Sequence, residues 1–96
     1  MTKFGIEKKP FDVLIDLAKK HKVLRKQIGL TQAELAKRSG VSFGSIKRFE
    51  LTGQISLESL LKSAQILNRM SDFELILNSD ENLKNIEKLF SDRTKI

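Results

Sequence analysis

Polar side chains that could bind an anion gather between residues 31 and 48, on both sides of Gly40. Lys47 and Arg48 carry cationic donors that suit phosphate oxygens, or the edge of a guanine where they reach it. The serine hydroxyl groups just before them can donate to a phosphate or to a base edge. Gln32 stands in the first turn of an expected helix, where its amide and the free backbone N–H groups can hold a phosphate. The segment therefore indicates nucleic-acid binding through a candidate set of eight residues: Thr31, Gln32, Ser42, Phe43, Gly44, Ser45, Lys47 and Arg48.

Other kinds of chemistry lack the residues that they need. His21 is the single histidine and the chain has no cysteine, so a metal site is not expected and His21 is assigned to the inner face of its helix or its edge. The serines have no candidate base beside them. Glu34 and Glu50 are interpreted as a capping carboxylate and a helix-anchoring carboxylate. Since no paired acids, phosphate-binding glycine loop or cofactor motif occurs, we expect neither an enzyme nor a bound cofactor.

The charge of the chain favours a polyanionic partner. The net charge is +6, and the whole excess of Lys and Arg over Asp and Glu lies in residues 1–55. Such a balance fits nucleic acid or an anionic membrane surface. The first helix, with Lys19, Lys20, Lys22, Arg25 and Lys26, would add a diffuse attraction, although its lysines could equally form a solvated face. Membrane association ranks last, because the apolar face of that helix lacks the Trp and Phe content of an interfacial anchor.

The length and the apolar spacing predict one all-α domain. Ninety-six residues suit a single domain, and apolar side chains recur at helical spacing almost throughout. The absence of cysteine, of a signal peptide and of a membrane span fits a cytoplasmic protein. We expect an N-terminal arm (1–10), a DNA-binding domain (11–78) and a C-terminal tail for dimer or partner contact (79–96). Within them the pattern predicts a five-helix bundle and favours a sixth helix in the tail: 10–28, 31–39, 42–51, 56–67, 73–77 and 80–90.

Local signals mark the ends of these helices. Pro10 opens the first helix, and Thr31 with Glu34 forms a capping box at the second. Ser42 and Ser56 cap the third and fourth helices, and "SDFE" from Ser71 reads as a second capping box before the fifth. The expected inward positions are Phe11, Leu14, Leu17, Ala18, Leu24 and Ile28 on the first helix, Leu35, Ala36, Val41, Ile46 and Phe49 around the corner at Gly40, and Leu57, Leu60, Leu61, Ala64 and Leu67 on the fourth helix.

The third helix has the dimensions of a probe for duplex DNA. A helix of about nine residues is roughly 13 Å long and fits a major groove about 12 Å wide. With Ile46, Phe49 and part of Glu50 inward, the other side chains of this helix, from Phe43 to Arg48, are left for the outside.

The stretch "TQAELAKRSGVSFGSIKRFE" resembles the helix-turn-helix of the Xre family, the phage repressor and Cro type. The likeness is carried by Thr31-Gln32, Leu35-Ala36, Gly40-Val41-Ser42, Ile46 and Glu50, and the helix pattern extends it from about Phe11 to Leu77. It implies sequence-specific binding of double-stranded DNA, as a two-fold dimer on a palindromic operator. Family members commonly read bases with glutamine at the front of the third helix, where this chain has Phe43 and Gly44. Phe43 could pack on a thymine methyl, or could instead turn inward as a core or dimer contact.

A second resemblance concerns the C-terminal part. "ISLESLL" and "DFELIL" look like the short Xre regulators encoded beside HipA-like kinase toxins, which act as antitoxin and autorepressor together. This resemblance implies a dimer interface formed by the helices after residue 56 and a toxin protein as second partner. Two functions therefore compete: a DNA-binding autorepressor, and a protein-interaction module that neutralises a toxin.

Overall fold

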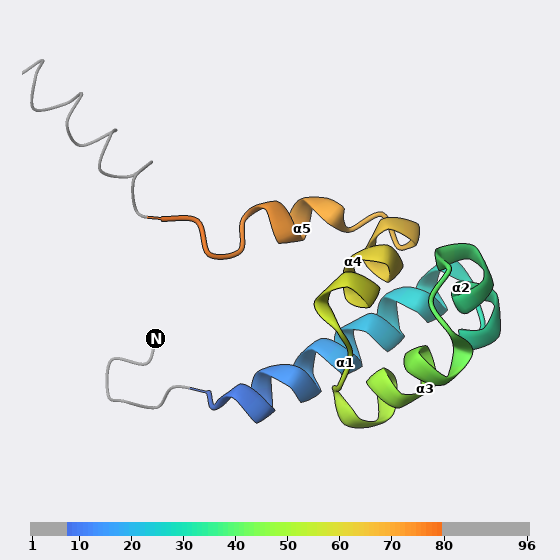
Figure 1. The fold of residues 1–96 in the computed structure, drawn as a ribbon, viewed down its shortest axis with the longest axis horizontal. Coiled ribbons are helices and arrows are strands. Elements are labelled where there is room, and N and C mark those ends of the chain that lie inside the picture. Colours follow the sequence, from blue (N-terminus) through green and yellow to red (C-terminus); the bar gives the residue numbers. More distant parts are fainter. Residues whose placement is uncertain (1–7, 80–96) are drawn as a thin grey trace, which may run out of the picture.

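A computed structural model describes residues 8–79 of the chain as a bundle of helices (Figure 1). These residues form five helices and no strand, which confirms the all-α prediction: α1 (Pro10–Ile28), α2 (Gln32–Ser39), α3 (Phe43–Thr52), α4 (Leu57–Ile66) and α5 (Met70–Glu74). The predicted sixth helix, and residues 1–7 of the predicted N-terminal arm, lie outside the described residues.

Most helix ends lie where the local signals placed them. Thr31 Oγ1 accepts the Glu34 backbone N–H at 3.0 Å, and Glu34 Oε1 accepts the Thr31 N–H at 2.8 Å, so the capping box is confirmed. Ser42 and Ser56 accept backbone N–H groups at the starts of α3 and α4 in the same way. Gly40 ends α2 with a φ of 77°, a left-handed conformation that other residues rarely adopt.

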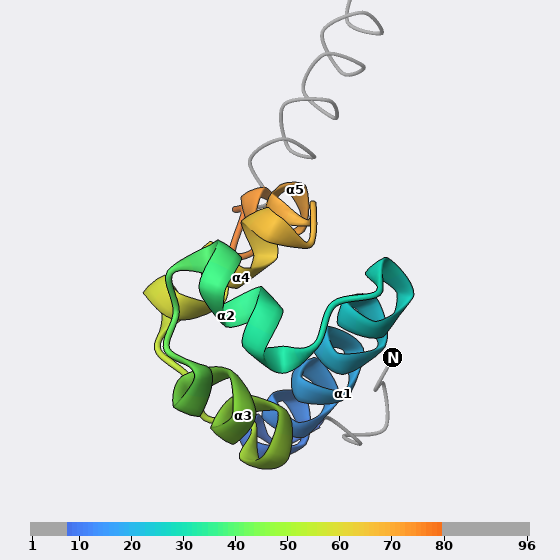
Figure 2. The same ribbon diagram turned by 90° about the vertical axis from the view of Figure 1, so that its right-hand side faces the viewer.

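The helices pack around a small core between α1, α2, α3 and α4. α1 packs against α3, α2 packs against both α3 and α4, and α5 packs on α4 (Figures 1 and 2). The two figures place α3 and α5 at opposite ends of the molecule. All five side chains expected inside around the Gly40 corner are buried: Leu35, Ala36, Val41, Ile46 and Phe49.

The predicted apolar faces of α1 and α4 are only partly correct. Phe11 is 65% exposed, Leu14 and Ile28 are also exposed, and Leu57 in the first turn of α4 is 66% exposed. α1 has 19 residues whereas α3 and α4 have 10 each, so the ends of α1 project beyond the helices that could cover them.

The predicted start of α5 is wrong. Ser71 lies inside the helix, the residue at the N-cap is Arg69, and no side chain caps this end. The chain turns earlier, at Asn68 with a φ of 60°, and Arg69 Nε donates to Asp72 Oδ2 at 2.9 Å across the first turn. The apolar run Leu75–Leu77 consequently follows the helix instead of forming it.

Candidate nucleic-acid interface

The outer side of α3 is presented by a firmly packed helix. Ile46 and Phe49 are 0% and 1% exposed, which fixes the rotation of the helix about its axis. Phe43 is 48% exposed and Lys47 and Arg48 are exposed, so the alternative that Phe43 belongs to the core is wrong. The contact of these side chains with DNA stays a prediction.

The front of α3 carries hydroxyl groups and a cation next to an aromatic ring. Ser42 Oγ accepts the Ser45 N–H at 3.1 Å and donates to Ser45 Oγ at 2.8 Å, so the Ser45 hydroxyl hydrogen is available for another acceptor. Lys47 Nζ lies 6.0 Å from the centroid of the Phe43 ring. A Cβ at Gly44 would meet nothing within 4 Å, so packing does not require glycine there.

Arg48 is oriented by the end of its own helix. Its Nη2 donates to Gln54 Oε1, and Thr52 Oγ1 donates to the Arg48 carbonyl oxygen at 2.8 Å. A guanidinium group has five N–H donors, so this bond leaves most of them for a phosphate or a base.

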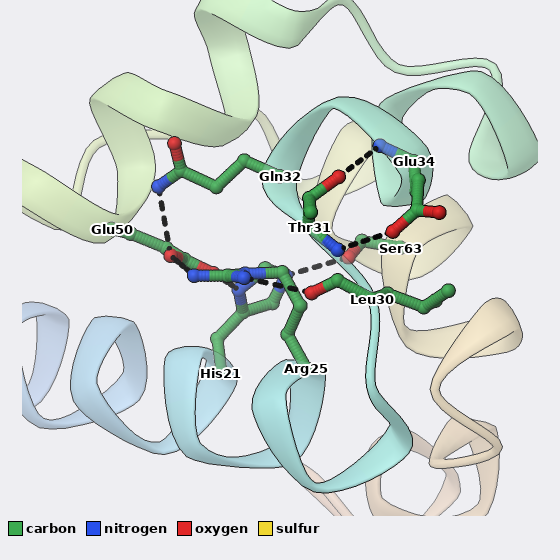
Figure 3. A network of polar contacts seen from close by, with 8 residues as sticks. All are labelled: His21, Arg25, Leu30, Thr31, Gln32, Glu34, Glu50 and Ser63. Atoms are coloured by element: carbon green, nitrogen blue, oxygen red, sulfur yellow. Dashed lines mark hydrogen bonds and ion pairs between the residues drawn. The ribbon is translucent and has the colours of Figure 1, made fainter.

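The first turn of α2 is coupled to α3 through Gln32. Gln32 Nε2 donates to Glu50 Oε1 at 2.9 Å, and Figure 3 shows its carbonyl oxygen pointing away from Glu50. Gln32 is half-buried, whereas Thr31 is exposed. The side-chain amide predicted to hold a phosphate is thus oriented by the end of α3, with one of its two amide hydrogens already used.

Glu50 is the centre of a buried polar network that joins α1, α2, α3 and α4 (Figure 3). Its carboxylate accepts from Arg25 Nε at 2.9 Å, Arg25 Nη2 at 2.8 Å and Gln32, and His21 Nδ1 lies 2.7 Å away. Arg25 Nη1 donates to the Leu30 carbonyl oxygen at 2.8 Å, and His21 Nε2 lies 2.6 Å from Ser63 Oγ. The helix-anchoring role predicted for Glu50 is therefore present, and its partners form the anchor.

The network fixes the protonation states of its members. Burial acts to raise the pKa of Glu50, but hydrogen bonds from Arg25, Gln32 and His21 outweigh burial and lower its pKa to about 2. Burial lowers the pKa of His21, against the opposing effect of Glu50. An ionised Glu50 can only accept, so neutral His21 carries its hydrogen on Nδ1, and its Nε2 accepts from the Ser63 hydroxyl.

Sequence reasoning missed this network and misplaced one of its members. Arg25 is 6% exposed and paired with Glu50, so it does not belong to the basic outer face of α1, which keeps Lys19, Lys20, Lys22 and Lys26. His21 and Ser63 are also buried, at 5% and 0% exposure. The available signal was the position of Arg25 four residues after His21, which places both on one face of a helix that also carries Ala18.

The described part of the chain contains neither a candidate metal site nor a candidate membrane-spanning helix. Residues 8–79 contain no group of three or more His, Cys, Asp or Glu side chains that could hold a metal ion. None of the helices in that range is both long enough and apolar enough to cross a membrane.

Comparison with known proteins identifies the same segment. A family model described as helix-turn-helix matches residues 22–73, more than half of the chain. The match begins within α1, contains α2, α3 and α4 and ends in α5, so residues 10–21 of α1 precede it. Searches of curated proteins and of solved structures returned no match.

Proposed function

This chain belongs to the helix-turn-helix family of DNA-binding transcription regulators. We propose that it binds double-stranded DNA sequence-specifically and represses its own gene. The observation that carries this proposal is the outer side of α3, where Phe43, Lys47 and Arg48 are exposed on a helix whose inner side is fully buried. α3 has 10 residues, about 15 Å of helix, and can enter a major groove with its N-terminal end first.

The exposed groups divide into two kinds of contact. The Thr31 hydroxyl, Gln32 and the N-terminal N–H groups of α2 bind backbone phosphates and set the position of the protein on the duplex. Ser42, whose hydroxyl hydrogen goes to Ser45 Oγ, orients the Ser45 hydroxyl. Ser45 and Arg48 donate to base edges or to the adjacent phosphates.

Phe43 and Gly44 give this protein a base preference different from that of family members with glutamine at the front of the third helix. The exposed Phe43 ring packs on a thymine methyl, and Lys47, whose ammonium lies 6.0 Å from that ring, reaches the neighbouring phosphate or a guanine. Gly44, with open space around it, lets the helix backbone approach the bases closely. With few hydrogen-bonding side chains at the front, part of the specificity comes from DNA shape.

We further propose a two-fold dimer on a palindromic operator, with half-sites about 34 Å apart. The exposed apolar side chains on α4 and after α5 support a dimer contact on that side, since α3 lies at the opposite end of the molecule (Figure 2). Such a dimer leaves both copies of α3 free for DNA.

Selection of bound duplexes from random DNA, with sedimentation to count the protomers, tests this function directly. On the selected duplex, Lys47→Ala with Arg48→Ala should weaken binding at least about tenfold, since one base contact is worth about 1–3 kcal/mol. The log–log salt slope should also fall by about 0.9 for each phosphate that the double variant no longer neutralises.

A matched control removes the same charge elsewhere. Lys62→Ala with Arg69→Ala deletes two exposed cations from α4 and its junction with α5 and should leave affinity nearly unchanged. Unchanged affinity in the α3 double variant, with its fold intact by circular dichroism, would refute the assignment of α3 as the reading helix.

A second function, neutralising a HipA-like kinase toxin, is favoured by one observation. Leu75, Ile76 and Leu77 are 72%, 54% and 97% exposed, an apolar run directly after α5. A toxin complex using this run should survive high salt, and Leu75→Asp with Ile76→Asp should abolish it. Because the same run supports the proposed dimer contact, this variant should also bind the palindromic operator more weakly. Loss of neither activity would remove the run from both interfaces.

A further inference from the structure

Phe43 is the first residue of α3 and stands at the end of the helix that would enter a major groove. Ser42 Oγ accepts the Ser45 N–H at 3.1 Å, so the helix begins at this point and its first side chain has a defined position. Phe43 is 48% exposed, whereas Phe49 on the same helix is 1% exposed. The core therefore uses one aromatic ring of α3 and leaves the other about half exposed to solvent.

The surroundings of the Phe43 ring leave it free to make an apolar contact. The next residue, Gly44, has no side chain, and a Cβ there would meet nothing within 4 Å. Lys47 Nζ lies over the ring at 6.0 Å from its centroid, a cation–π contact that orients the ring and uses one of its two faces. Because a phenyl ring has neither a hydrogen-bond donor nor an acceptor in its plane, the other face can recognise a base only by apolar contact.

A base pair presents a single kind of apolar group in the major groove, the C5-methyl group of thymine. Cytosine has a hydrogen atom at C5, and the major-groove edges of adenine and guanine are hydrogen-bonding groups. The modified base 5-methylcytosine carries the same methyl group on the same ring atom as thymine. An aromatic ring that reads only this group therefore separates methylated from unmethylated pyrimidines and accepts both bases that carry the methyl group.

We propose that Phe43 recognises the C5-methyl group of a pyrimidine, supplied either by thymine or by 5-methylcytosine. DNA binding then responds to cytosine methylation at one position of each half-site. This role rests on the proposed function, in which α3 enters the major groove. Each methyl group should change the affinity about fourfold, the effect of burying one methylene-sized group, and about fifteenfold when both half-sites change together.

Single methyl groups in the DNA test this role with the unmodified protein. Selection from unmodified random DNA offers thymine as the only methylated base, so we expect thymine at the position that Phe43 reads. Replacing the thymines of the selected duplex one at a time by deoxyuridine removes only the methyl group, and at that position the affinity should fall about fourfold. At the same position, a pair of 5-methylcytosine with guanine should bind about fourfold more tightly than a pair of cytosine with guanine.

Two alanine variants assign the methyl effects to one side chain. Phe43→Ala should abolish both effects, so that thymine and deoxyuridine duplexes bind equally. Leu51→Ala is the matched control, because it also removes an exposed apolar side chain from α3, at 79% exposure, but near the other end of the helix, and it should keep both effects. Each effect is a ratio between two duplexes and one protein, so a loss of stability alone does not change it. Low salt strengthens the phosphate contacts and keeps the weaker complexes measurable.

The outcomes separate the role of Phe43 from the proposed function. A selection that returns no preferred duplex would overturn both. A preferred duplex whose affinity changes with none of its methyl groups would leave sequence-specific binding in place and overturn only the role of Phe43. Methyl effects that persist in Phe43→Ala would overturn this role as well. The same holds if thymine binds better than deoxyuridine while 5-methylcytosine binds no better than cytosine.

Discussion

Replacing Glu50 with glutamine should cost about 3 kcal/mol of the free energy of unfolding at pH 7. The Glu50 side chain is 3% exposed, and its oxygens face four donor groups, on Arg25, His21 and Gln32. Glutamine keeps the shape but removes the charge and turns one acceptor into a donor that faces other donors. Lowering the pKa of Glu50 from 4.5 to about 2 corresponds to about 3 kcal/mol at 1.36 kcal/mol per unit. Breaking a buried ion pair costs a similar amount, about 3–5 kcal/mol.

Urea unfolding followed by circular dichroism measures this cost, and its dependence on pH identifies the cause. Because the pKa of Glu50 is lower in the folded state, its contribution is complete above pH 4.5 and is lost as the pH falls toward 2. The unfolding free energies of Glu50→Gln and the unmodified protein should therefore converge over that interval. As control, Glu58→Gln alters a carboxylate that is 80% exposed and should change stability by less than about 0.5 kcal/mol. A loss below about 1 kcal/mol at pH 7, or curves that stay parallel from pH 4.5 downward, would refute the role given to Glu50.

Four further substitutions test other parts of the fold by the same unfolding assay. His21→Gln should remove the decline in stability between pH 6.5 and pH 4.5, since the pKa of the single histidine is lowered by burial and the folded state favours its neutral form. An unchanged decline in that interval would contradict this. Thr31→Ala should cost about 0.5–2 kcal/mol through loss of the α2 cap, and no loss would show that the cap contributes nothing. Gly29→Ala should lower the free energy of unfolding by about 1 kcal/mol, because its φ is positive although a Cβ there meets nothing within 4 Å. Gly53→Ala should lower it by more, because its φ is also positive and a Cβ there lies 2.9 Å from the backbone of Leu14. Equal losses would show that the close approach is relieved without cost.

The parts of the fold that the sequence predicts are those decided by neighbouring residues. The capping box at Thr31 and the stop at Gly40 depend on a few adjacent residues, and both ends of α2 lie where expected. The rotation of α3 was also predictable, because Ile46 and Phe49 are three residues apart on a helix short enough to have one apolar side.

The parts that the sequence does not predict depend on contacts between distant residues. His21 and Ser63 are 42 positions apart, and Arg25 and Glu50 are 25 apart, so no local pattern shows that they meet. Arg25 was therefore grouped with the lysines of α1. The prediction that Phe11 is buried was wrong for a related reason. Its spacing is that of a core residue, but no partner helix extends far enough to cover it.

The buried network explains how so small a core can hold the candidate interface rigid. One carboxylate joins α1 through Arg25, α2 through Gln32 and, through His21, α4, so the angle of α3 is set by directional bonds as well as by apolar packing. Apolar side chains alone allow small rotations at little cost, whereas a bidentate Arg–Glu pair permits one geometry. Because Gln32 lies among the proposed phosphate contacts and bonds to Glu50, the same carboxylate aligns both helices that would face DNA. Stability and the shape of the reading surface are therefore properties of one set of bonds in this protein.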